Sequence, residues 1–166
     1  MLAAGHVSNL DPWALGLEIW PGRFLRFMAK SELFWFPLSL FISGVGAFKV
    51  NRGRADREAI ETAVVLAREG NVIAMFPEGT RRKKGLRKKY EAQAHTGAAR
   101  IALEAGVPLV PAGIKGTDGL RRLAAWRVRY GAPVELDDLR DQEMSEAARI
   151  ATDRLMAEIH KLEESL

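Results

Sequence analysis

Hydrophobic runs bounded by turn residues alternate along the chain with segments of helical periodicity. The short apolar runs predict strands, which we place at residues 1–4, 24–29, 46–50, 72–76, 107–114 and 126–130. Between and after them, apolar residues recur at the three- and four-residue spacing of amphipathic helices. This alternation is typical of an α/β domain, in which helices cover a sheet.

Helix start and stop signals delimit four predicted helices. One begins near Pro12, in PWALGLEIW, and a second runs from Asp56 to Gly70 with Ile60, Val64 and Ala67 on its apolar face. A third covers residues 95–105, before Gly106. The last opens at Ser145 and carries one apolar stripe: Ala148, Ala151, Leu155, Ile159 and Leu162. No repeat, linker or composition shift divides the chain, which predicts one domain over residues 1–166.

The composition fits a folded domain with a core, because 48% of the residues are apolar and 28% are charged. The chain has no cysteine, which excludes disulfides, thiolate metal sites and a cysteine nucleophile. Residues 1–4 leave no room for a secretory signal before His6. The longest uncharged stretch, residues 33–48, contains Pro37 and would reach only about 24 Å as a helix, short of a ~30 Å hydrocarbon core.

Positive charge is concentrated in one segment. Seven Lys and Arg residues lie within residues 81–89. The whole chain has a formal net charge of +4, so the rest of the chain has a net charge of 4 − 7 = −3. Such a segment favours a local anionic partner, namely a phosphorylated lipid, the phosphates of coenzyme A or an anionic membrane surface, and argues against nucleic acid. The alternative is a solvated loop without a partner.

Aromatic residues are concentrated near the start of the chain, and Phe34, Trp35 and Phe36 are adjacent. Three neighbouring side chains cannot all point inward from one helix face. One or two are therefore expected at the surface or in a cavity, where they would suit an acyl groove or the headgroup level of a membrane. Ordinary packing under the sheet is the alternative.

Candidate catalytic chemistry lies in two short segments. The first, GHVSNLDP, contains His6 and Asp11, and an imidazole oriented by a carboxylate is a common general base for a hydroxyl. The second, Phe76 to Arg81, reads F-P-E-G-T-R, and a turn with these residues is suited to holding an anion. Together the two segments predict transfer to an alcohol that carries a phosphate.

Each segment also has a purely structural interpretation. Asp11 before Pro12 fits a helix N-cap, His6 fits a loop or core histidine, and residues 77–80 fit a plain turn. Ser8 beside His6 would indicate a hydrolase, but it lacks the G-x-S-x-G elbow. A metal site is not expected, because His95 and His160 are the only other imidazoles and both are distant in sequence.

In sequence and spacing, the H-x4-D and F-P-E-G-T-R segments resemble the motifs of the glycerolipid acyltransferases, the family of 1-acylglycerol-3-phosphate acyltransferases. Residues 46–52 (GAFKVNR) and 107–111 (VPLVP) resemble the two remaining motifs of that family. The four blocks follow the family's order and span His6 to Pro111, which is about two thirds of the chain.

The resemblance implies an α/β acyltransferase domain with a mixed, mostly parallel sheet flanked by helices. It implies transfer of a fatty acyl group from acyl-CoA or acyl carrier protein to the free hydroxyl of 1-acylglycerol-3-phosphate, giving phosphatidate for phospholipid biosynthesis, without a cofactor or metal. His6 and Asp11 would be catalytic. The acceptor would be bound by five residues: Arg52, Glu78, Gly79, Thr80 and Arg81. Such a protein is expected in the cytoplasm, peripheral to the inner face of the membrane.

Three features depart from the family pattern. Gly5 replaces a common asparagine, residues 94–97 (AHTG) replace a lysine-bearing segment, and the N-terminal helices of the family are expected to be absent. Two alternatives therefore stay open: acyl transfer to another polar lipid, such as a glycosylated or amino-acid lipid, and a non-catalytic module that binds anionic surfaces through residues 81–89.

Overall fold

The protein folds as an alternation of strands and helices. The computed structural model describes residues 1–17, 19–30, 47–50, 56–79, 94–118 and 125–166. The elements in chain order are β1 (Leu2–Ala4), α1 (Asp11–Leu17), β2 (Leu25–Lys30), β3 (Ala47–Val50), α3 (Asp56–Arg68), β4 (Val72–Met75), α4 (Gly97–Ala105), β5 (Val110–Lys115), β6 (Arg127–Tyr130), the 3-10 helix η3 (Asp137–Leu139) and α5 (Met144–Glu164). Every predicted strand and helix is present.

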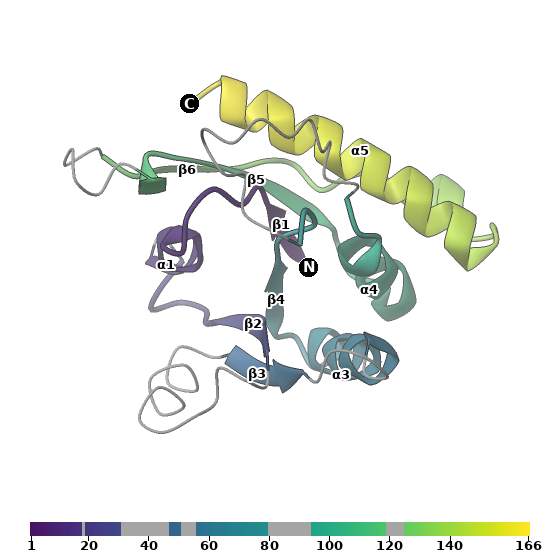
Figure 1. Cartoon of the computed structure of the whole chain (residues 1–166). Helices are drawn as coiled ribbons and strands as arrows, with labels where there is room; N and C mark the ends of the chain where they lie inside the picture. Colours follow the sequence, from purple (N-terminus) through teal and green to yellow (C-terminus); the bar gives the residue numbers. More distant parts are fainter. Residues whose placement is uncertain (18, 31–46, 51–55, 80–93, 119–124) are drawn as a thin grey trace.

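The strands form one six-stranded sheet in the order β3-β2-β4-β1-β5-β6. β1 is parallel to its neighbours β4 and β5, β2 is parallel to β3 and β4, and β6 is antiparallel to β5. Figure 1 shows α1 on one face of the sheet and α3, α4 and α5 on the other. The predicted α/β fold with a mixed, mostly parallel sheet is confirmed.

β1 lies at the centre of the core and is buried on both faces. Because side chains alternate along a strand, Ala3 packs with the apolar residues of α3, α4 and α5, whereas Leu2 and Ala4 pack with those of α1. Burial on both faces is typical of a strand inside a parallel sheet. The segment that follows β1, which contains His6, therefore starts from a fixed point in the molecule.

Among the element boundaries that differ from the sequence prediction, the starts of β5 and α5 have clear physical reasons. β5 begins at Val110, whose N–H donates to Met1 O at 2.8 Å. Pro108 has no N–H to donate, and only its carbonyl bonds to this strand end, by accepting from the Met1 amino group at 2.9 Å. α5 begins at Met144, and the carboxylate of Glu143 caps it by accepting the N–H groups of Ser145 and Glu146. The prediction that Ser145 opens this helix was wrong, since a carboxylate can accept two amides and suits the positive helix end.

Several sequence predictions fall outside the described residues. These are the exposure of Phe34, Trp35 or Phe36, and the cationic segment 81–89. Among the helices that the structure does describe, none combines the length and hydropathy needed to cross a bilayer.

Candidate active site

The two predicted catalytic segments meet at one edge of the sheet. β1 and β4 are parallel neighbours with Leu2 opposite Ala74 and Ala3 opposite Met75, so the residues after each strand emerge side by side. The rings of His6 and Phe76 stack there, with their centroids 4.3 Å apart and their planes 19° from parallel. The structure thus joins the H-x4-D segment to the F-P-E-G part of the second segment.

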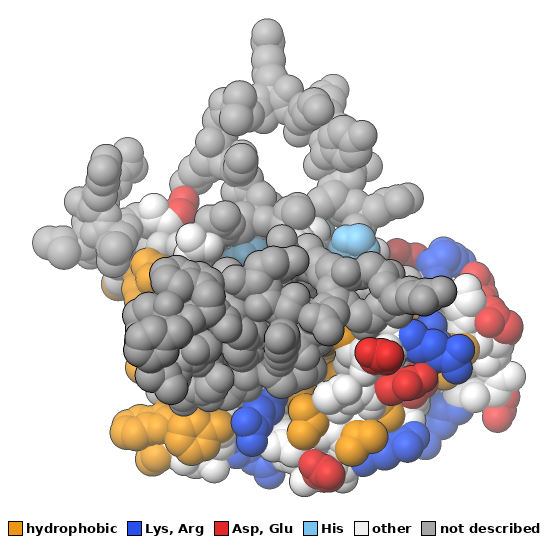
Figure 2. Space-filling model, turned by 60° about the horizontal axis from the view of Figure 1, so that its bottom comes forward, with side chains coloured by type: hydrophobic (Ala, Val, Ile, Leu, Met, Phe, Trp, Pro, Cys, Tyr) orange, Lys and Arg blue, Asp and Glu red, His pale blue; other side chains and the backbone are white. Residues whose placement is uncertain are grey.

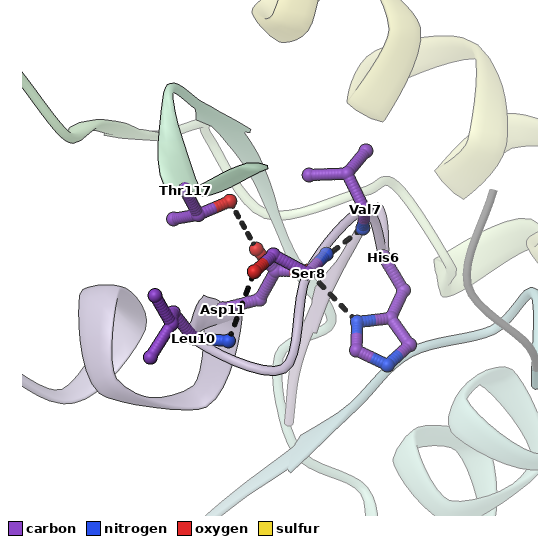
Figure 3. A network of polar contacts seen from close by, with 6 residues as sticks. All are labelled: His6, Val7, Ser8, Leu10, Asp11 and Thr117. Atoms are coloured by element: carbon purple, nitrogen blue, oxygen red, sulfur yellow. Dashed lines mark hydrogen bonds and ion pairs between the residues drawn. The ribbon is translucent and has the colours of Figure 1, made fainter. Parts of the chain in front are cut away.

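His6 is held by the carboxylate of Asp11. Its Nδ1 lies 2.8 Å from Asp11 Oδ2, and the same oxygen accepts the N–H groups of Val7 at 2.7 Å and Ser8 at 2.8 Å (Figure 3). An ionised carboxylate only accepts hydrogen bonds, so Nδ1 carries a proton and Nε2 of the neutral ring has the free lone pair. Nε2 points away from Asp11 (Figure 3), and 18% of the His6 side chain is exposed. The ring is therefore arranged to accept a proton through Nε2.

Asp11 is fully buried, and its second oxygen has a partner that the sequence analysis missed. Thr117 Oγ1 donates to Asp11 Oδ1 at 2.5 Å, across 106 residues of sequence. Burial alone would raise the pKa of Asp11, but hydrogen bonds from His6, Ser8, Thr117 and Val7 outweigh that effect and lower this pKa below its ordinary value. Asp11 is therefore ionised at neutral pH. A Gly-Thr pair just after a predicted strand was the available sequence signal for this partner.

The helix-cap interpretation of Asp11 is wrong. Asp11 is the first residue of α1, and the four donors to its carboxylate all lie outside that helix. The local turn is supported instead by Ser8, whose Oγ accepts the N–H of Leu10 at 3.2 Å. Asp11 therefore orients the loop that carries His6.

The F-P-E-G segment forms a tight turn that lies against a second histidine. Gly79 N donates to Phe76 O at 3.0 Å, and Gly79 has a φ of 65°. His95 N donates to Pro77 O at 2.8 Å, and a Cβ on Gly79 would lie only 2.7 Å from His95 Cδ2. Glycine is required here by both the backbone and the neighbouring ring. Glu78 is buried within this turn and Gly79 is exposed.

Of the five predicted acceptor-binding residues, the structure describes Glu78 and Gly79, both in the turn next to His6. Arg52, Thr80 and Arg81 lie outside the described residues. Within the described ranges, no three His, Cys, Asp or Glu side chains gather in a way that could hold a metal ion. What the described site offers is an oriented proton acceptor beside a glycine turn.

Comparison with known proteins bears directly on this arrangement. A family model described as Acyltransferase matches residues 1–115. The chain is 30% identical over 172 residues to the 1-acyl-sn-glycerol-3-phosphate acyltransferase of Bacillus subtilis (strain 168), with 100% of this chain and 82% of that protein covered. It is 35% identical over 127 residues to the probable 1-acyl-sn-glycerol-3-phosphate acyltransferase of Mycoplasma genitalium, with 72% and 45% covered.

The fold is similar to a solved structure. The crystal structure of the 1-acyl-sn-glycerophosphate acyltransferase PlsC from Thermotoga maritima matches with a TM-score of 0.61 and 24% identity, over 97% of this chain and 65% of that one. Since the family model matches most of the chain and the Bacillus subtilis relative aligns with all of it, this protein belongs to the acyltransferase family.

Proposed function

We propose that this protein transfers a fatty acyl group from acyl-CoA or acyl carrier protein to the free hydroxyl of 1-acylglycerol-3-phosphate, forming phosphatidate for phospholipid biosynthesis. The observation that carries the proposal is the His6–Asp11 pair, held at 2.8 Å beside the F-P-E-G turn at one sheet edge. Family membership and the names of the relatives that match this chain support the same reaction.

In this proposal His6 acts as the general base. Nε2 takes the proton of the acceptor hydroxyl while the hydroxyl oxygen attacks the thioester carbonyl. The C–S bond then breaks, and the departing sulfur receives the proton from the imidazolium. Asp11 stabilises the imidazolium that forms between these steps. General base catalysis of this kind contributes about 10²–10⁴-fold.

Binding of the glycerol-phosphate acceptor is assigned to the motif residues, with Arg52 and Arg81 as the ligands of its phosphate. Glu78 and Gly79 belong to the turn next to His6. Arg52, Thr80 and Arg81 are included because of their motif positions, and guanidinium groups make bidentate contacts to phosphate oxygens. Replacement of Arg81 by lysine keeps the charge but removes the fork, so KM for the phosphorylated acceptor should rise while KM for monoacylglycerol scarcely changes. Equal increases for both acceptors would remove Arg81 from phosphate binding.

Peripheral association with an anionic membrane is the second part of the proposal. From the end of α1 to the start of β2, three large apolar side chains are unusually exposed: Leu17 (60%), Trp20 (60%) and Phe24 (62%). Arg23 and Arg26 are exposed beside them. We call these five residues the aromatic–basic surface. Figure 2 shows hydrophobic side chains next to Lys and Arg side chains on this side of the molecule.

The chemistry of the aromatic–basic surface suits a bilayer of anionic lipid. Tryptophan favours the headgroup level, and each cation near an anionic surface contributes roughly 1 kcal/mol. The surface lies where β2 begins, and Leu25 pairs there with Val72 at the start of β4. His6 follows the end of β1, and therefore lies at the opposite edge of the sheet from the start of β2 and β4. This contact would hold the domain at the membrane through the sheet edge opposite His6.

Product identification tests the proposed reaction. Purified protein is incubated with labelled acyl-CoA, or labelled acyl carrier protein, and either 1-acylglycerol-3-phosphate or monoacylglycerol, and the labelled lipid is identified by mass spectrometry. We expect labelled phosphatidate from the phosphorylated acceptor. A second incubation offers a mixed lipid extract as the source of acceptors. Labelling of a different polar lipid there would identify that lipid as the acceptor instead. No labelled product with either donor would reject acyl transfer.

A further inference from the structure

The two oxygens of the Asp11 carboxylate are held by different parts of the chain. Oδ2 receives three donors from its own loop, namely His6 Nδ1, Val7 N and Ser8 N. Oδ1 receives Thr117 Oγ1 at 2.5 Å, from beyond β5. One oxygen therefore faces the proposed general base, and the other is fixed to the segment that follows β5.

Thr117 is delivered to this position by the turn after β5. β5 pairs with β1, with Leu2 opposite Val110 and Ala4 opposite Ala112, so both strands end at the same sheet edge. Gly116 then adopts a φ of 91°, and a Cβ at this position would lie 2.4 Å from Ala125 O. This close approach places Thr117 next to Asp11.

Water is poorly placed to replace the Thr117 hydroxyl. Thr117 is 1% exposed and Asp11 is 0% exposed. If the hydroxyl is lost, Oδ1 keeps a buried negative charge without a donor among the described residues, and rotation of the carboxylate is no longer opposed from that side. The direction of the Asp11–His6 hydrogen bond, and hence of Nε2, depends on that rotation.

We infer that Thr117 is a positioning residue for the proposed acyl transfer, acting through Asp11 on the orientation and tautomer of His6. This inference rests on the proposed function for its kinetic effect. It assigns no contact between Thr117 and substrate, and the burial of Thr117 is in keeping with that.

The first test is a pair of substitutions with a matched control. Thr117→Val keeps the shape and removes the hydroxyl, so kcat should fall about tenfold or more while KM for both substrates stays within about twofold. Thr117→Ser restores the donor and should recover most of kcat. The control is Thr152→Val, since Thr152 is also buried but its Oγ1 donates to Ala148 O inside α5 at 2.7 Å. It should lower Tm without changing kcat.

A double-mutant cycle with Asp11→Asn separates positioning from general structural damage. If Thr117 acts through Asp11, then Thr117→Val should lower kcat much less in the Asp11→Asn background than in the wild type. Equal fold-losses in both backgrounds would overturn the inference. Unchanged kcat in a folded Thr117→Val variant, or failure of Thr117→Ser to recover activity, would do the same.

An NMR measurement tests the inference without turnover. The chain has three histidines, and His6→Ala identifies the His6 signals in long-range ¹H–¹⁵N spectra of the imidazoles. At a pH where the ring is neutral, wild type should show the Nδ1–H tautomer, and Thr117→Val should show a mixture. An unchanged tautomer would overturn the inference. If wild type transfers no acyl group while Thr117→Val still shifts the tautomer, the proposed reaction fails and the positioning role stands.

Discussion

At the scale of single residues, the site depends on one buried charge. Asp11 is fully buried, and a buried carboxylate is costly unless donors compensate it. Four donors do so, and they tie together the His6 loop, the start of α1 and the turn after β5. The same hydrogen bonds that orient the imidazole therefore also stabilise the fold.

The first prediction concerns Asp11→Asn at neutral pH. An amide cannot accept the bonds of both carboxylate oxygens, so buried donors lose their partner, and the free energy of unfolding should fall by about 1–3 kcal/mol. Urea denaturation at pH 7 measures this change. A loss as small as that of an exposed substitution such as Asp141→Asn, which changes a surface carboxylate, would show that the network contributes little to stability.

The second prediction concerns pH. The pKa of Asp11 is lower in the folded protein than its ordinary value of about 3.9, so its contribution to stability is complete above about pH 4 and is lost as pH falls toward the folded pKa. The difference in unfolding free energy between wild type and Asp11→Asn should therefore be constant from pH 7 to pH 5 and shrink below about pH 4. Denaturation curves across this range provide the measurement, and a difference that grows on acidification would contradict the prediction.

The sequence was sufficient for the His6–Asp11 contact but not for Thr117. His6 and Asp11 lie within one short loop, so their spacing and chemistry indicate the pair. Thr117 reaches Asp11 from 106 residues away, and its position depends on which strands are neighbours. A threonine after a strand has many ordinary uses, and the residue pattern alone did not single it out.

At the scale of elements, the position of α5 on the sheet depends on the absence of a side chain in β5. A Cβ on Gly113 would lie 2.9 Å from both Glu163 N and Leu162 C in the last turn of α5. Backbone atoms cannot be displaced as cheaply as the end of a flexible side chain. The helix therefore lies as close to β5 as a glycine permits.

The third prediction tests this close packing. Gly113→Ala should force α5 away from β5 and lower the unfolding free energy by about 1–3 kcal/mol. Gly16→Ala in α1 is the control, because no described atom lies within 4 Å of its added Cβ and alanine favours a helix. Thermal unfolding of both variants provides the comparison. Equal Tm values for Gly113→Ala and wild type would show that α5 can move away from β5 without loss of stability.

Periodicity predicted which elements exist but not all of their ends. The apolar stripes of α3 and α5 are buried as predicted, with Val64, Ala67, Leu155 and Ile159 in the core. The start of α5 was misplaced because a glutamate carboxylate, Glu143, caps it in place of a serine hydroxyl. Capping depends on side-chain geometry that hydrophobic periodicity does not contain.

At the scale of the whole molecule, the sheet order determines where chemistry is located. Periodicity indicates the strands but not that they assemble as β3-β2-β4-β1-β5-β6. This order places β1 between β4 and β5, so the residues after all three strands meet around His6. Residue spacing cannot show this, because strand order is set by long-range packing.

The fourth prediction concerns the aromatic–basic surface. If it contacts a bilayer, replacing Trp20 and Phe24 by serine should reduce binding to anionic vesicles. Replacing Arg23 and Arg26 by glutamine should remove much of the vesicle binding that depends on salt concentration. Val65→Ser is the control, since Val65 is 53% exposed on α3, outside this surface. Co-sedimentation with neutral and anionic vesicles over a salt series provides the measurement. Equal losses for Val65→Ser would remove the aromatic–basic surface from membrane binding.

The most direct measurement is the rate of acyl transfer to 1-acylglycerol-3-phosphate by His6→Ala compared with wild type, with labelled acyl donor at saturating acceptor. We expect labelled phosphatidate from wild type and a kcat at least about a hundredfold lower in the variant, because His6 accepts the proton through Nε2. The variant should stay folded but unfold more easily, since it loses one donor to Asp11 and the ring contact with Phe76. A well-folded His6→Ala protein that transfers the acyl group at the wild-type rate would contradict the assignment of His6 as the general base.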